Sequence, residues 1–168
     1  MERLCQTVLA FLLCATASAA AQQGEAVRQI STAAGRRILH TEADVTDKAK
    51  PRIDSTEFGS ITIGGTVYKH DVVIRLDGKV EKRKKKLSKQ ETGTSHIISL
   101  DEAKQVYQDG AVRLIMGTGQ SGMAKLSDAA AEYFKQKGCA VELLPTPAAV
   151  QAWNRAEGAV IGLFHVTC

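Results

Sequence analysis

The sequence has few aromatic side chains and no closely spaced pair of cysteines. Phenylalanine, tryptophan and tyrosine make up 5% of its 168 residues, which leaves little aromatic surface to stack on bases or sugars. The cysteines are Cys5, Cys14, Cys139 and Cys168, and none form the C-x-x-C pair used in structural zinc and redox sites. Beyond the N-terminus, no apolar run approaches the ~20 residues that a membrane-spanning helix needs. These absences argue against a cysteine-based metal framework and against a protein with several membrane spans.

Apolar residues account for 44% of the chain, which is enough to bury the core of one ordinary domain. The formal net charge is +4, but the segment from Lys79 to Lys89 alone carries +6, so the remaining residues sum to −2. We expect a local basic patch with these members: Lys82, Arg83, Lys84, Lys85 and Lys86. The favoured interpretation is a solvated edge strand or loop whose lysines prevent strand-to-strand aggregation. Contact with nucleic acid or an anionic membrane is the alternative, weakened because no aromatic residues interleave with the lysines.

The N-terminus resembles a secretory signal over residues 1–21, with Arg3 near the start, an apolar stretch from Val8 to Ala15 and small residues after it. This pattern predicts export to the periplasm or the medium. Two alternatives stay open: a permanent membrane anchor, and a true start near Val45, which would make the protein cytoplasmic. Residues 22–50 are polar and weakly patterned, and we expect a linker or poorly ordered segment there.

The first half of the remaining chain predicts β-hairpins. Two alternating runs, Ile61–Ile63 and Thr66–Tyr68, flank a Gly-Gly pair, which is typical of a tight hairpin turn. The run His70–Leu76 predicts another strand, followed by a turn at Asp77-Gly78. We therefore expect a β-meander before the basic segment.

The second half predicts alternating helices and strands in an α/β fold. Ser99 with Glu102 forms a capping box before a helix that should end near Gly110, and Ser127 should begin a second helix. Thr146 should cap a third, with proline at its first position. The expected strands are Val112–Met116, Cys139–Leu144 and Ala159–Val166. The β-α-β-α-β order predicts a parallel sheet through the right-handed crossover rule.

Parallel strands place their following loops at one edge of the sheet, so the chemistry of three loops should meet there. The expected neighbours are the ligand-binding candidates Gly117, Thr118, Gly119, Gln120, Ser121, Gly122, Thr146, His165, Thr167 and Cys168. Cys139 begins a strand whereas Cys168 follows one. Because a seven-residue strand spans ~20 Å, no disulfide is predicted between these two cysteines.

The glycine loop 117–122 has G-x-G-x-x-G spacing between a strand and a helical pattern, which can hold an anion on backbone amides. A dinucleotide is a weak candidate ligand, because Glu142 lies mid-strand and three parallel strands supply only half of a two-nucleotide fold. The alternatives are glycines selected for a tight turn and close packing, or a site for a smaller anion or metabolite.

Three side chains of this edge could react. Ser121 resembles the nucleophile of an elbow motif, although Met123 replaces its second glycine. His165 and Cys168 could ligate zinc or form an activated thiolate, but a metal needs more than two ligands and His96 cannot be placed from sequence. We therefore expect no metal, no cofactor and no assigned catalytic residue.

Six short motifs stand out along the chain: Arg52–Gly59, Glu91–His96, the glycine loop 117–122, Leu144–Thr146, Ala152–Asn154 and the ending Phe164–Cys168. Together they resemble the Mth nine-three-eight domain family of small α/β proteins. The resemblance spans residues 51–168 and implies a three-layer α/β/α-like single domain without an established catalytic activity. Its eukaryotic relatives include an adipogenesis-associated cytoplasmic protein and a mitochondrial assembly factor for respiratory complex one.

The sequence and this resemblance together favour a non-catalytic binding or assembly protein that acts through protein partners. The alternative is a small-molecule or anion-binding enzyme that uses the same edge, with Ser121, His165 or Cys168 as its reactive group. The lysine-rich segment and the first fifty residues depart from the family pattern, which leaves the partner and the location open.

Overall fold

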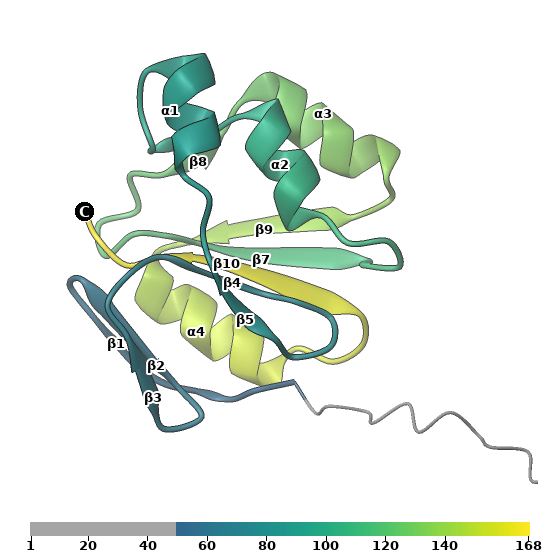
Figure 1. Ribbon diagram of the computed structural model, residues 1–168. Coiled ribbons are helices and arrows are strands. Elements are labelled where there is room, and N and C mark those ends of the chain that lie inside the picture. Colours follow the sequence, from purple (N-terminus) through teal and green to yellow (C-terminus); the bar gives the residue numbers. More distant parts are fainter. Residues whose placement is uncertain (1–49) are drawn as a thin grey trace, which may run out of the picture. The chain divides into compact units, whose positions relative to one another are not determined.

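The computed structural model describes residues 50–168 (Figure 1). The predicted signal peptide, nearly all of the predicted linker and the alternative start at Val45 lie outside the described residues. Across residues 50–168, no helix combines the length and the apolar character that crossing a membrane requires.

A five-stranded mixed sheet forms the centre, with strand order β5-β4-β10-β7-β9. These strands are β5 (Val80–Lys82), β4 (Val72–Ile74), β10 (Val160–His165), β7 (Arg113–Thr118) and β9 (Ala140–Leu144). Strands β10, β7 and β9 are parallel, as the β-α-β-α-β pattern predicts, and β4 and β5 extend the sheet antiparallel. The chain is thus an α/β protein, as expected from the sequence.

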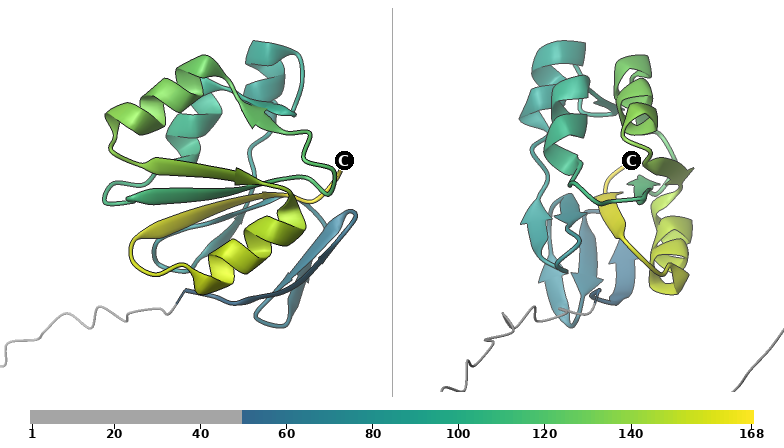
Figure 2. Two further views of the ribbon diagram at one scale, coloured as in Figure 1. Left: turned by 180° about the vertical axis from the view of Figure 1, so that it is seen from behind. Right: turned by 90° about the vertical axis from the view of Figure 1, so that its right-hand side faces the viewer.

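Helices cover both faces of this sheet and produce the three layers (Figure 2). The helices are α1 (Lys86–Thr92), α2 (Leu100–Val106), α3 (Asp128–Gln136) and α4 (Thr146–Arg155). Figure 1 shows α1, α2 and α3 on one side and α4 on the other. Alternation along the strands divides the core accordingly: Leu114 and Met116 of β7 pack with Phe134 of α3, whereas Ile115 packs with Trp153 of α4.

A smaller antiparallel sheet lies beside α4 and contains β1 (Ile53–Glu57), β2 (Ser60–Ile63) and β3 (Thr66–Tyr68). Its β2–β3 turn confirms the predicted hairpin: Gly64 and Gly65 have φ of 52° and 76°, as a turn with two left-handed residues requires. The side chain of Asn154 joins this sheet to α4, because it accepts from the Ile53 amide and donates to the Ile53 carbonyl.

The prediction of one continuous meander was wrong, because β4 pairs with β10 and not with β3. All three residues of β4 are buried, which suits an interior strand with a face toward each helical layer. A short parallel pair, β6 (Ile97–Ile98) with β8 (Lys125–Leu126), was not predicted.

Serine caps begin two helices as expected: Ser99 accepts from the Glu102 amide and Ser127 accepts from the Ala130 amide. Helix α2 ends at Val106, earlier than predicted. Helix α4 begins one residue earlier than predicted, with Pro145 as its N-cap. The hydroxyl of Thr146 does not cap the helix, because it is buried and bonds to the Gly119 amide and the His165 carbonyl.

Candidate functional site

The carboxyl ends of β7 and β10 lie side by side, since Thr118 pairs with His165 in the parallel register. The glycine loop leaves β7 here, and the segment Val166–Cys168 leaves β10 at the same edge, near the C-terminus marked in Figure 1. We call this edge the C-terminal rim. It brings together the loop 117–122, Thr146 and the segment 165–168, the neighbours that the parallel arrangement predicts.

Two glycines of the loop are needed because other parts of the chain approach closely. Gly119 has φ of +99°, and a Cβ atom there would lie 2.5 Å from the Thr167 backbone oxygen and 2.6 Å from that of Cys168. A Cβ atom at Gly117 would lie 2.8 Å from the Thr146 hydroxyl oxygen. The glycines thus allow β7 and its loop to pack against the start of α4 and the end of the chain.

Three amides of the glycine loop, those of Gly119, Ser121 and Gly122, are bonded within the chain. The Gly119 amide donates to Thr146 Oγ1 at 3.0 Å, and the Ser121 amide donates to the Cys168 backbone oxygen at 2.6 Å. The Gly122 amide donates to the Gly119 carbonyl at 3.3 Å. These bonds favour the turn-and-packing explanation of the glycine motif over an anion cradle, because a cradle needs amides that point at the ligand.

Two polar side chains of the loop, those of Thr118 and Gln120, bond to neighbouring elements. Thr118 Oγ1 donates to the Leu144 carbonyl at 2.9 Å, and Gln120 Nε2 donates to Thr56 Oγ1 of β1 at 3.1 Å. Thr146 is buried and connects two elements, since its hydroxyl donates to the His165 carbonyl and accepts from the loop. Ser121 is exposed.

A buried histidine–carboxylate pair lies directly behind the rim. His165 is buried at the end of β10, and its Nδ1 lies 2.8 Å from Asp71 Oδ2. The Val166 amide donates to Asp71 Oδ1 at 3.1 Å. Burial alone would raise the pKa of Asp71, but the bonds from His165 and Val166 and the charges of His165 and Arg83 bring it down from 3.8 to about 2. Asp71 is therefore a carboxylate near neutral pH and accepts the Nδ1 proton of His165.

Arg83 was predicted to be part of the basic patch, and this prediction was wrong. Its side chain is fully buried, with Nε 2.6 Å from Glu102 Oε1 and Nη1 3.3 Å from Asp71 Oδ2. It also donates to the Ser95 carbonyl at 2.7 Å, and Ser88 donates to the same Glu102 carboxylate. The sequence shows only a run of basic residues, and it does not reveal that one of them, Arg83, has two buried carboxylate partners whereas its neighbours are exposed.

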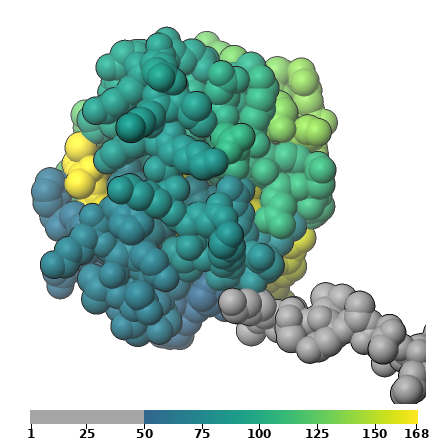
Figure 3. Space-filling model, in the orientation of Figure 1, coloured from purple at the N-terminus to yellow at the C-terminus, as the bar shows by residue number. Residues whose placement is uncertain are grey.

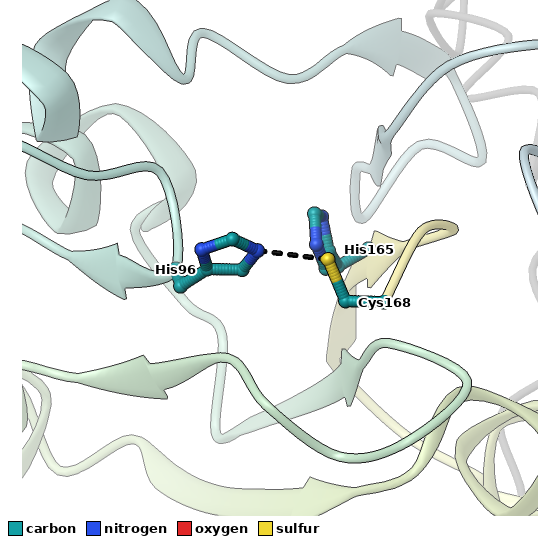
Figure 4. A group of neighbouring side chains, drawn as sticks. All are labelled: His96, His165 and Cys168. Carbon is teal, nitrogen blue, oxygen red and sulfur yellow. Dashed lines mark hydrogen bonds between the residues drawn. The ribbon is translucent and has the colours of Figure 1, made fainter.

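His96 completes the rim and was the residue that sequence reasoning could not place. It precedes β6, and its Nε2 lies 2.9 Å from Cys168 Sγ (Figure 4). Its ring is perpendicular to that of His165, with centroids 5.5 Å apart. Potential ligand atoms of His96, His165 and Cys168 all lie within 4.8 Å of one another. The parallel pairing of β6 with β8 fixes the segment that carries His96, and no local sequence signal indicates such a pairing.

The cysteines of the described part of the chain do not form a disulfide, as predicted. Cys139 is buried before β9, where burial raises the pKa of its thiol, and Cys168 is half-buried at the rim.

A family described as a protein of unknown function, DUF498/DUF598, matches residues 53–163. The chain belongs to this family. Its description assigns no reaction, so membership establishes the fold and leaves the activity open.

Solved structures of similar proteins agree with the family assignment. The conserved hypothetical protein PH1505 from Pyrococcus horikoshii OT3 is 29% identical with a TM-score of 0.64, over 70% of this chain and 99% of that one. The protein MT938 is 29% identical with a TM-score of 0.60, over 71% of this chain and all of that one. An outer membrane protein from Bartonella henselae, 16% identical over 72% of this chain and 98% of that one, shares the fold with a TM-score of 0.50. The resemblance to the Mth nine-three-eight domain family is confirmed.

In this family member the lysines of the predicted basic patch lie at one edge of the large sheet. Lys82 is the last residue of the edge strand β5, and Lys84, Lys85 and Lys86 lead into α1, all four exposed. The Lys85 ammonium lies 3.9 Å from Asp71 Oδ2. Figure 3 shows the face that contains β5, formed mainly by residues drawn in blue and teal, with yellow C-terminal residues at its left edge. Lysines beside an edge strand suit the favoured interpretation of protection against aggregation.

Proposed function

We propose that this protein is a non-catalytic binding protein that acts through a protein partner, and that an extended acidic segment of the partner docks along β9. The observation that carries the proposal is the groove between β9 and α3. It has a volume of about 570 Å³, and its lining is formed by Lys125, Leu126, Ala131, Lys135, Gly138, Cys139, Ala140, Val141 and Leu143.

The groove borders the outer edge of the large sheet. Strand β9 is the last strand in the sheet order and pairs with β7 on its inner side. An edge strand offers backbone donors and acceptors to which an extended peptide can add as a further strand. Alternate side chains of such a peptide would enter the groove.

The residues that line the groove indicate which side chains of a partner would fit it. Leu143 is 45% exposed and lies on the same strand face as Val141, which is half-buried against the core. The exposed Lys125 adds positive charge to the groove, and the exposed Lys135 also lines it, with its ammonium 3.7 Å from Glu132 Oε2. An extended segment with apolar side chains at alternate positions and acidic residues beside them would complement this surface.

The enzymatic alternative draws less support from the geometry. It requires an anion held on the amides of the glycine loop, but Gly119 and Ser121 already donate within the chain. His165 at the rim bonds to Asp71 and lies 3.2 Å from Thr167 Oγ1, so its polar contacts are with residues other than Ser121.

The proposal is tested with full-length tagged protein purified from its native host as wild type, Leu143→Glu and Val112→Glu. Val112 is 57% exposed and lies outside the groove, so its variant controls for a surface carboxylate. We expect a partner that wild type and Val112→Glu retain equally and that Leu143→Glu retains at least about tenfold less, a loss of roughly 1.4 kcal/mol. Equal retention of every co-purifying protein by the three forms would contradict docking at β9.

A further inference from the structure

Three side chains that bind metals well converge at the C-terminal rim. His96 comes from the segment before β6, His165 ends β10, and Cys168 follows three residues later. Their potential ligand atoms lie within 4.8 Å of one another. Figure 4 shows the ring of His96 directed at the Cys168 sulfur, with His165 beside that sulfur. Two imidazoles and a thiol form a ligand set that suits zinc.

The surrounding hydrogen bonds orient the two imidazoles. Asp71 accepts from Nδ1 of His165, so in the neutral imidazole Nε2 carries the lone pair, 3.2 Å from Thr167 Oγ1. Arg83 Nη1 lies 3.3 Å from the same Nδ1. A carboxylate behind a histidine is the usual arrangement around protein zinc ligands, where it fixes the tautomer and increases basicity. For His96, Nδ1 lies 3.2 Å from Thr94 Oγ1 and Nε2 faces Cys168.

The rim is also accessible. His165 is buried, whereas His96 and Cys168 are half-buried, so an ion can enter from the solvent side and displace few groups. The ligands come from segments far apart in the sequence, which is why their spacing resembles no zinc motif.

We propose that the C-terminal rim binds one divalent zinc ion through His96, His165 and Cys168. The Cys168 thiol loses its proton to solvent when its sulfur binds the ion, and water occupies the fourth position. This site is separate from the β9 groove, and the proposal stands or falls independently of the docking of a partner there.

The test uses full-length protein stripped of metal by a chelator and titrated with Co²⁺ and then with Zn²⁺ as competitor. The variants are His96→Ala and Cys168→Ser, both at partly exposed positions, with His70→Ala as the matched control. His70 is a half-buried histidine that packs edge-on against Tyr68, outside the cluster. Circular dichroism confirms that each variant is folded.

We expect one equivalent of Co²⁺ with intense visible bands of a tetrahedral ion and a thiolate-to-cobalt charge-transfer band. Cys168→Ser should lose the charge-transfer band, His96→Ala should bind Zn²⁺ at least tenfold more weakly, and His70→Ala should match wild type. Three results would each overturn the proposal: no stoichiometric binding, a charge-transfer band that survives Cys168→Ser, or equal zinc affinity in wild type and His96→Ala.

Discussion

At the residue scale, individual atoms of the C-terminal rim explain why certain residue types occur there. Gly119 is the clearest case, because both its positive φ and the two backbone oxygens beside it exclude a side chain. Thr146 is the second, because its hydroxyl is the shared partner of a loop amide and a strand carbonyl. Neither role requires a ligand, so both residues belong to the framework of the rim.

Replacement of Gly119 by alanine should destabilise the protein more than replacement of Gly138. Both glycines have positive φ, which costs alanine about 1–2 kcal/mol. Only Gly119 would also place its new methyl group against Thr167 and Cys168, since nothing lies within 4 Å of a Cβ atom at Gly138. Urea denaturation should show a free energy of unfolding at least about 1 kcal/mol lower for Gly119→Ala than for Gly138→Ala. Equal free energies of unfolding for the two variants would show that the C-terminal segment does not pack closely against Gly119.

Removal of the Thr146 hydroxyl should be costly even though the replacement is apolar. Thr146→Val leaves the Gly119 amide and the His165 carbonyl without this buried partner, a loss of about 1–3 kcal/mol. Thr146→Ser keeps the hydroxyl and should lose less. Thermal unfolding of the two variants measures the difference, and a Thr146→Val variant as stable as Thr146→Ser would refute the bridging role.

At the element scale, one arginine connects the β4–β5 hairpin to the end of α2. Arg75 donates to the carbonyls of Gln105 and Val106, which are free acceptors at the helix C-terminus, and to Glu81 on β5. Lys79 bonds to the same Glu81 carboxylate. Bonds from Lys79 and Arg75 lower the pKa of Glu81 from 4.5 to about 2.

This depressed pKa predicts a pH dependence of stability. The contribution of Glu81 is complete above pH 4.5, the pKa in the unfolded chain, and is lost as pH falls through the folded value of about 2. Because the pair is partly exposed, we expect at most about 1 kcal/mol. The measurement compares urea denaturation of wild type and Glu81→Gln between pH 5 and pH 2: the wild-type advantage should shrink as the pH falls. A difference that stays constant across this range would contradict the ion-pair assignment.

Local patterns in the sequence predicted most elements, and longer-range pairing decided the rest. Ser99 and Ser127 cap helices as expected because a cap depends on residues three positions away. Strand β4 pairs with β10, which lies about ninety residues later in the chain, and no local pattern specifies this pairing. The parallel order of the strands allowed the sequence to predict that the glycine loop meets His165 and Cys168. The approach of His96 and the burial of Arg83 depend on contacts between distant segments, so the sequence did not predict them.

At the scale of the whole molecule, the sheet has two different edges. Strand β5 carries Lys82 and leads into three more exposed lysines, which discourage pairing with another strand. Strand β9 carries the exposed Leu143 beside the groove that it forms with α3. Under the proposed function, the partner docks at the β9 edge and not at the β5 edge.

Export through residues 1–21 stays a prediction, which N-terminal sequencing of the native protein would test. A mature end near Ala20 or Gln22 supports export, and an end near Val45 contradicts it.

The most direct test of the proposed function is photo-crosslinking in the native host. A benzophenone side chain is placed at position 143 in one form of the full-length protein and at position 112 in the other. Position 143 lies in the groove and position 112 outside it, and both are exposed in the wild type. We predict a discrete covalent adduct with one partner protein from position 143 and none of that size from position 112. The absence of an adduct at position 143, or the same adducts from both positions, would contradict partner docking at β9.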